Sequence, residues 1–126
     1  MALILGVALL GAVGCVARWA LTAAIQTRLG VAWPVGTFVV NALGSTAIGV
    51  VMGAFLARGA ESAPVRVALT AGFLGGFTTM SSFAYDTVRL IEGRSFLAAA
   101  LNAFGSVAVC LLGCALGVAA GRAVVR

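Results

Sequence analysis

The chain has 126 residues, of which 63% are hydrophobic and 9% charged, and its formal net charge is +5. A soluble domain normally carries about a quarter charged residues, so this composition excludes an ordinary soluble fold. In a soluble protein the positive charge would suggest a nucleic-acid partner. Here the cations are all arginine and lie mostly at the ends of apolar stretches, where anchoring to lipid headgroups explains them better. We therefore expect a membrane protein that contacts lipid and no nucleic acid.

Four apolar stretches are long enough to cross a bilayer, which takes roughly 20 residues. They run over about Ala2–Ile25, Val35–Ala57, Val65–Leu90 and Phe96–Ala120. The loops between them are short, so residues 1–126 are predicted to form a single all-α domain of four transmembrane helices. The first stretch lacks a basic leading region and is followed by further spans, so we do not interpret it as a cleaved signal peptide. Pro34 and Pro64 lie just before or at helix starts, where a missing N–H costs little.

The arginines give almost no information on orientation. Four spans place both termini on one side of the membrane, together with Arg58, Arg66, Arg122 and Arg126. The other side has Arg28, Arg89 and Arg94, with Arg18 near it. This near balance leaves the positive-inside rule without a clear answer. Either a partner orients the chain, or the chain inserts both ways and pairs as an antiparallel dimer; four short helices enclose a polar path poorly, which favours the dimer.

Small residues recur four apart in two of the predicted helices. The second span contains Ser45, Gly49 and Gly53 at this spacing, and the fourth contains Gly113, Gly117 and Gly121. Such stripes let helix backbones approach closely in a membrane, so they predict tight helix packing.

Polar residues also share helix faces. The stripes are Thr37, Asn41 and Ser45 in the second span, Thr79, Ser82, Phe83 and Asp86 in the third, and Asn102, Ser106 and Cys110 in the fourth. Residues three, four or seven apart lie on one side of a helix. The stripes either supply hydrogen bonds between helices or line a path for a polar solute.

The chemistry of these stripes favours a small anion as that solute. No Asp or Glu lies near the middle of a span, and Asp86, toward the end of the third, is expected to pair with Arg89. Amide and hydroxyl groups and aromatic ring edges are donors. A proton-coupled small-molecule transporter of the small multidrug-resistance type remains the alternative, although it would need a mid-membrane carboxylate. A membrane assembly factor that binds a partner helix is a third class, and no nucleophile–base pair or metal cluster indicates an enzyme.

The stretch GFLGGFTTMSSFAYD (Gly72–Asp86) predicts a break in the third helix. Each of its three glycines lowers helix stability by about 1 kcal/mol relative to alanine. Irregular backbone at membrane depth is tolerated only where it is buried in protein or lines a cavity. One hypothesis is that the glycines let the helix break and free carbonyl oxygens for a hard cation. The alternative is a glycine kink that merely allows close helix crossing.

Two of these stretches resemble a known family. The segment GTFVVNALGSTAIG (Gly36–Gly49) resembles the second-helix motif of the Fluc, or CrcB, fluoride channels, and Gly72–Asp86 resembles their third-helix signature. The resemblance covers essentially the whole chain. It implies a dual-topology antiparallel homodimer in the cell (inner) membrane, with two pores that pass fluoride passively out of the cytoplasm.

The resemblance also assigns roles to single residues. It implies that the backbone carbonyls of Gly75 and Thr78 bind a central, structural sodium ion. Of two pore phenylalanines only the second is retained, as Phe83, and Met80 occupies the first position without an electropositive ring edge. The pore or fluoride-binding set that it implies is Asn41, Met80, Ser81, Ser82, Phe83, Ser106 and Cys110.

Three further positions depend on the same comparison. Cys110 stands where a hydroxyl residue is usual, and Asn102 replaces a more typical aromatic residue. The resemblance also implies a track of hydroxyl groups along the pore, which would run through Ser81, Ser82 and Ser106. Arg18 is expected to anchor a vestibule or a helix end.

Overall fold

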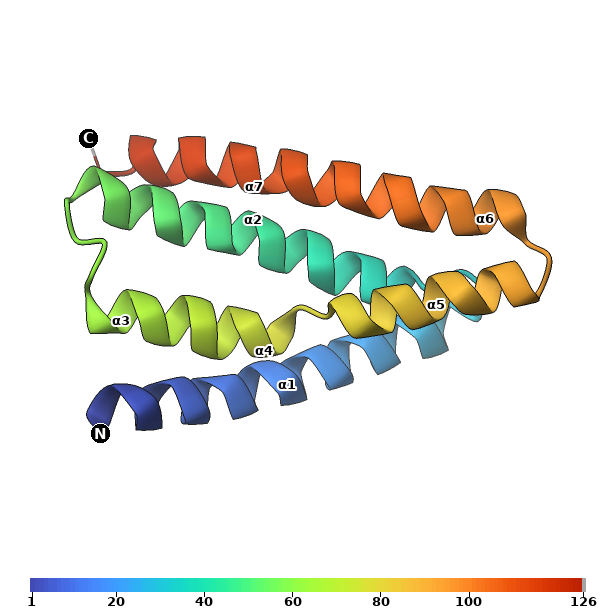
Figure 1. Cartoon of the computed structure of the whole chain (residues 1–126), viewed down its shortest axis with the longest axis horizontal. Helices are drawn as coiled ribbons and strands as arrows, with labels where there is room; N and C mark the ends of the chain where they lie inside the picture. The colour runs from blue at the N-terminus through green and yellow to red at the C-terminus, as the bar shows by residue number, and fades with distance from the viewer. Residues whose placement is uncertain (126) are drawn as a thin grey trace.

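The computed structural model describes residues 1–125, which form helices joined by short connections (Figure 1). In chain order the elements are α1 (Ala2–Leu29), α2 (Val35–Ala57), α3 (Pro64–Val67), η1 (Ala68–Leu74), α4 (Gly75–Phe77), α5 (Met80–Glu92), α6 (Phe96–Ala100), η2 (Leu101–Gly105) and α7 (Ser106–Ala123). The elements η1 and η2 are π-helical. Together the elements make four rods that are long and apolar enough to cross a membrane, namely Ala2–Leu29, Val35–Ala57, Pro64–Glu92 and Phe96–Ala123. The predicted all-α class with four such helices is confirmed.

The rod ends follow local backbone chemistry. The helix α1 continues one turn beyond the expected end at Ile25 and stops at Gly30, which is left-handed with φ 60° and donates its N–H to the carbonyl of Gln26. Glycine adopts this conformation without a Cβ penalty, so it ends the helix. As predicted, Pro34 directly precedes α2 and Pro64 begins α3.

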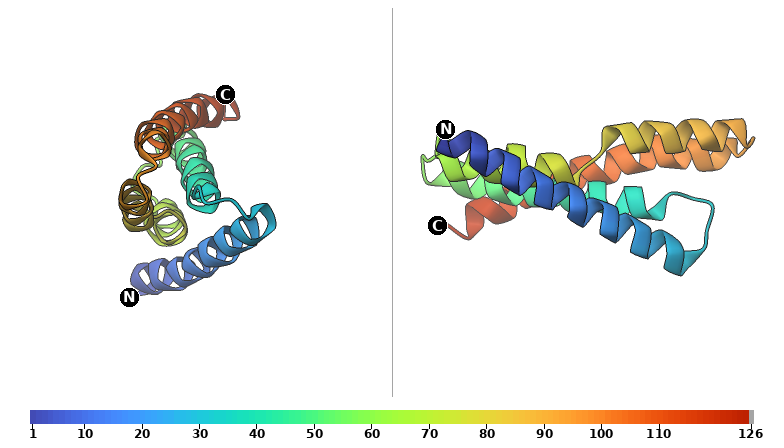
Figure 2. Two further views of the ribbon diagram at one scale, coloured as in Figure 1. Left: turned by 90° about the vertical axis from the view of Figure 1, so that its right-hand side faces the viewer. Right: turned by 90° about the horizontal axis from the view of Figure 1, so that it is seen from below.

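The helices α2 and α7 lie side by side along most of their length (Figures 1 and 2). The two predicted small-residue stripes meet at this contact. A Cβ on Gly49 would overlap the backbone carbonyl of Cys114, and one on Gly117 would overlap the carbonyl of Thr46. Only glycine permits this backbone separation, so the packing role predicted for both stripes is confirmed.

The third rod is broken, but not at its glycines. Gly72 and Gly76 lie in helical backbone and face α1, where a Cβ on Gly76 would come within 2.5 Å of the Gly11 carbonyl oxygen. The extended residues are Thr78 (φ −87°, ψ 158°) and Thr79 (φ −150°, ψ 110°). The prediction of a break is therefore correct and its attribution to the glycines is wrong. Those glycines allow close crossing, and β-branched threonines, which suit extended backbone, form the break.

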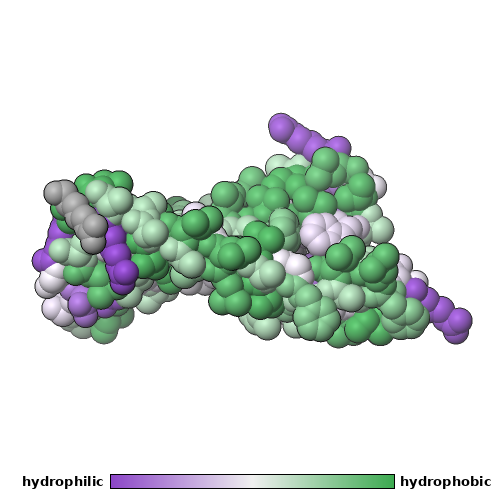
Figure 3. Space-filling model, turned by 90° about the horizontal axis from the view of Figure 1, so that it is seen from above, coloured by the Kyte–Doolittle hydropathy of each residue, from purple (hydrophilic) through white to green (hydrophobic). Residues whose placement is uncertain are grey.

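Little of the apolar surface is buried within one chain. The buried apolar residues are Val40, Ala68, Leu74 and Ala99. On the face shown in Figure 3, hydrophobic residues cover the middle of the molecule and hydrophilic residues lie at its two ends. This distribution suits a surface that faces lipid or a second protein chain.

Both marked ends of the chain lie at the same end of the bundle as the connection between α2 and α3 (Figure 1). Arginines occur at both ends of the bundle. At this end are Arg66 of α3, Arg122 of α7 and Arg58, directly after α2; at the other are Arg28 of α1, Arg89 of α5 and Arg94, between α5 and α6. Arg126, which was counted with the first group, lies outside the described residues. Among the described residues the arginines are therefore three against three, apart from Arg18 within α1.

Candidate functional site

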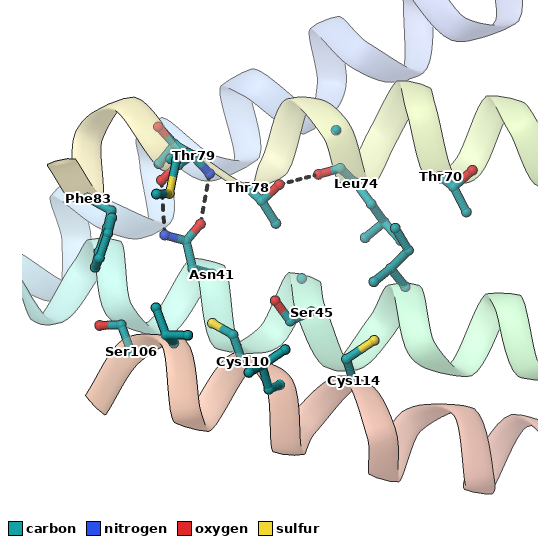
Figure 4. Close-up of a pocket in the computed structure, with 16 residues that line it drawn as sticks. Asn41, Ser45, Thr70, Leu74, Thr78, Thr79, Phe83, Ser106, Cys110 and Cys114 are labelled. Atoms are coloured by element: carbon teal, nitrogen blue, oxygen red, sulfur yellow. Dashed lines mark hydrogen bonds between the residues drawn. The ribbon is translucent and has the colours of Figure 1, made fainter. Parts of the chain in front are cut away.

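At the break, a side chain of α2 bonds the backbone of Thr79 and replaces the helical partner that its N–H has lost. The Asn41 amide Nδ2 donates to the Thr79 carbonyl at 3.0 Å, and Asn41 Oδ1 accepts from the Thr79 N–H at 2.7 Å (Figure 4). The Thr79 hydroxyl in turn accepts from the Ser82 N–H at 3.1 Å and so caps the start of α5. One residue of α2 therefore holds the extended segment in place.

This arrangement releases two backbone carbonyls. In a continuous α-helix the Thr79 N–H would donate to Gly75 and the Ser82 N–H would donate to Thr78. Both amides donate elsewhere, to Asn41 and to the Thr79 hydroxyl. The Gly75 and Thr78 carbonyls are thus separated from their helical donors.

Arg18 of α1 lies at the same break. Its Nε donates to the carbonyl of Gly76, near the end of α4, at 3.2 Å. A cation at a helix C-terminus satisfies an orphan carbonyl and interacts favourably with the helix dipole. The structure thus places Arg18 at a helix end.

A cavity of about 480 Å³ lies between the second, third and fourth rods next to the break (Figure 4). The predicted site residues that line it are Asn41, Gly75, Thr78, Met80, Phe83, Ser106 and Cys110. Thr70, Thr79 and Cys114 also line it and were missing from the predicted set. All three carried a signal in the sequence, since Thr79 belongs to the polar stripe of the third span, Cys114 extends the Ser106–Cys110 stripe by one turn and Thr70 is eight residues before Thr78.

Met80 and Phe83 differ in their surroundings. The Met80 residue is 72% exposed at the margin of the cavity, whereas Phe83 is half-buried. Within one chain, the position at which the family pattern expects a ring therefore points outward.

A second cavity, of about 190 Å³, lies on the other side of the break. It is lined by Arg18, Trp19, Thr22, Ala23, Gln26, Thr37, Thr79 and Ser82. The predicted track through Ser81, Ser82 and Ser106 is thus not continuous within one chain, because Ser82 faces this cavity and Ser106 the larger one. The exposed Ser81 lines neither cavity, since successive residues of a helix point in directions about 100° apart.

Asp86 does not pair with Arg89, so that expectation is wrong. The Thr37 hydroxyl, in a residue only 6% exposed, donates to Asp86 Oδ2 at 2.7 Å. Arg89 forms an exposed ion pair with Glu92 at 3.3 Å instead. The carboxylate of Asp86 turns toward the buried hydroxyl on α2, while Arg89 lies on the exposed side of α5.

Comparison with known proteins places the chain in a family. The model of the CrcB-like protein, Camphor Resistance (CrcB), matches residues 5–118. A Fluoride-specific ion channel FluC of Geobacter sulfurreducens is 47% identical over 97% of this chain and 98% of its own length. Proteins of the same name from Geotalea daltonii and Geobacter metallireducens are 43% and 42% identical over the same shares.

These relatives are named as ion channels, which agrees with the expectation that the chain is not an enzyme. The four apolar rods agree with a protein that crosses the membrane several times. The match covers most of the chain and includes both motifs on which the resemblance was based. The chain is a multi-pass membrane protein that belongs to the CrcB-like family.

Proposed function

We propose that the chain is a fluoride-selective ion channel through which fluoride leaves the cytoplasm passively. One observation carries this proposal: Asn41, Phe83 and Ser106, from three different rods, line one cavity. Among the described residues that line this cavity, none has a carboxylate side chain. The names of the relatives support fluoride as the permeant ion.

The lining groups are suited to a small anion. The Asn41 amide nitrogen carries two protons, and its one hydrogen bond in the described part of the chain uses a single proton. The second can donate to an anion in the cavity, where the Phe83 ring can offer its positive edge. These groups replace the water of a strongly hydrated ion, and chloride is rejected by pore width and donor spacing.

Passive export needs no coupled ion. The net charge of +5 draws anions toward the protein. An inside-negative potential then drives an anion outward with about 2.3 kcal/mol per elementary charge per 100 mV.

We further propose that two copies pair in antiparallel orientation and form two pores. The single chain leaves Met80 exposed at the cavity and most of its apolar surface outside. A second copy of the chain would cover Met80 and part of this apolar surface. The described arginines are balanced between the two ends of the bundle, which lets the chain insert in either direction.

A structural sodium ion fits the break. The Gly75 and Thr78 carbonyls have lost their helical donors and line the same cavity. Carbonyl oxygens are ligands that hard cations prefer. Two such pairs, one from each copy, would hold the ion and neutralise the carbonyl dipoles at the break.

The function is tested by ion efflux from liposomes that contain the purified protein at low density. A fluoride-selective electrode should record rapid passive fluoride efflux, and a chloride electrode should record little. Efflux no faster than from empty vesicles would refute the channel. Flux that requires a pH gradient would instead indicate the proton-coupled transporter.

Dual topology is tested with cysteines at opposite ends of the bundle. Ser62→Cys lies between α2 and α3, and Ser95→Cys lies between α5 and α6, both at exposed positions. In a background without the native cysteines, a membrane-impermeant maleimide should label about half of each variant on intact cells, as two opposite orientations require. Full labelling of one variant and none of the other would show a single orientation.

A further inference from the structure

Several polar contacts hold the helix α5 in place. None of its residues is buried, and the break at Thr78 and Thr79 separates it from α4. Two contacts with α2 hold its first half: the paired bonds between Asn41 and Thr79, and the bond from Thr37 to Asp86. A third contact, with the fourth rod, involves a side chain to which the proposed function gives no role.

That side chain is Asn102, in the π-helical segment η2. It is 1% exposed, although it is a primary amide in an apolar span. Its Nδ2 donates to Thr87 Oγ1 of α5 at 2.8 Å, and its Oδ1 accepts from Ser106 Oγ at 3.4 Å. Single turns of π-helix occur frequently at functional sites.

Thr87 carries the connection to Phe83. Its hydroxyl donates to the Phe83 carbonyl at 2.8 Å, one turn back along α5. The hydrogen bonds therefore run in one direction, from Ser106 to Asn102, to Thr87 and to the Phe83 backbone. The first and last residues of this run line the larger cavity, and Asn102 and Thr87 lie behind its wall.

We propose that Asn102 is a positioning residue for the ion path, an inference that rests on the proposed function. It sets the separation between the helix that carries Phe83 and the helix that carries Ser106. The Thr87 hydroxyl accepts the hydrogen bond from Asn102 and donates one to the Phe83 carbonyl. A displacement of Asn102 therefore shifts the Phe83 backbone as well.

Asn102 also determines which way the Ser106 hydroxyl points. A serine hydroxyl has one proton, and in this structure that proton is directed at Asn102 and away from the cavity. The 3.4 Å separation is long for a bond between two oxygens. A charged acceptor forms the stronger hydrogen bond. When fluoride is in the cavity, the Ser106 hydroxyl therefore rotates and donates its hydrogen bond to the fluoride instead of to Asn102. Asn102 thus orients the Ser106 hydroxyl when the cavity holds no anion, and the weak bond between them breaks readily when fluoride enters.

The test uses two variants of nearly unchanged shape. Asn102→Leu removes both bonds of the amide, and Thr87→Val removes the hydroxyl between Asn102 and Phe83. Each should lower fluoride efflux per reconstituted dimer by about tenfold and lower the ratio of fluoride to chloride permeability. The double variant should be no slower than the slower single variant, because both changes break one run of bonds. The control is Thr46→Val, since the Thr46 hydroxyl likewise bonds the carbonyl four residues back but lies outside both cavities; it should conduct like wild type.

Three outcomes would overturn the proposal. The first is wild-type efflux and permeability ratio in both single variants. The second is multiplication of the two effects in the double variant. The third is a loss of thermal stability with an unchanged permeability ratio, which would make Asn102 merely structural. If Asn102→Leu does not assemble, Thr87→Val decides the matter, because it only replaces one hydroxyl by a methyl group. Wild-type protein that passes no fluoride would refute the proposed function and not this inference.

Discussion

Asn41 and Thr79 are joined by two hydrogen bonds, one in each direction, between a side-chain amide and a backbone peptide. The asparagine therefore acts toward Thr79 as a neighbouring strand would, and it satisfies both backbone groups of an extended residue at membrane depth. Without it the break would leave the Thr79 N–H unpaired in an apolar environment, whereas the Thr79 carbonyl, at the N-cap of α5, also accepts the first bond of that helix. The same contact diverts the Thr79 N–H from the Gly75 carbonyl, so one side chain both stabilises the break and exposes the proposed cation ligand.

Asn41→Leu should therefore impair folding as well as conduction. It removes both bonds of the amide and leaves the Thr79 N–H without a partner, which should cost about 1–3 kcal/mol of stability. Thermal unfolding in detergent and fluoride efflux should both show the loss. Leu43→Ala, at an exposed position of the same helix, is the control. An Asn41→Leu protein that unfolds at the wild-type temperature would contradict the role assigned to this contact.

The glycines at the contact between α2 and α7 should not tolerate a methyl group. Gly49→Ala would bring a Cβ onto the Cys114 carbonyl, and separating the helices should cost about 1–3 kcal/mol. Gly105→Ala meets no atom within 4 Å and should gain up to about 1 kcal/mol from helix propensity. Thermal unfolding of the two variants should shift in opposite directions. Equal shifts would mean that helix propensity, and not the close contact, decides stability here.

The role of the aromatic ring at the cavity can be tested by replacing Phe83 with Met and, separately, Met80 with Phe. Phe83→Met leaves thioethers at both positions and should slow fluoride efflux by about tenfold or more, since an edge contact of about 1 kcal/mol and its packing are lost. Met80→Phe should keep fluoride efflux and raise the preference for fluoride over chloride. Both are measured by paired fluoride and chloride efflux. If Phe83→Met keeps the wild-type rate, the ring edge is not a fluoride ligand.

Sodium should stabilise the protein if carbonyls at the break bind it. Replacing sodium with N-methylglucamine should lower the unfolding temperature, because an ion at a hundred times its dissociation constant stabilises by about 2.7 kcal/mol. The dependence on sodium should be much weaker in Asn41→Leu, because the break that exposes the Gly75 carbonyl loses the hydrogen bonds that hold it open. Identical melting curves of the wild type in the two salts would exclude a sodium site of useful affinity.

Several features of the fold could be predicted from spacing. The stripes containing Gly49 and Gly117 were expected to pack closely, and the structure packs them against each other. Asn41, Phe83 and Ser106 were placed on three polar faces, and the structure brings all three to one cavity. These predictions succeeded because the face on which a helical residue lies depends only on its separation along the chain.

Other features could not be predicted from spacing. Asp86 was expected to bond Arg89, three residues away, but the buried Thr37 hydroxyl of another helix is its partner. Ser82 and Ser106 were assigned to one track, but they face different cavities. In both cases the outcome depends on which group of a neighbouring helix lies within hydrogen-bond distance.

The sequence by itself determined the four spans, the faces of the helices and the segment in which the third helix breaks, because hydrophobicity and helical periodicity are local properties. Only the tertiary structure decided that the break falls at Thr78 and Thr79. Gly72 and Gly76 instead pack against α1, and Asn41 of α2 supplies the partner that the Thr79 N–H lacks in an interrupted helix. A break in a membrane helix is stable only where another helix satisfies the released backbone groups, and the position of that other helix is a property of the assembled bundle.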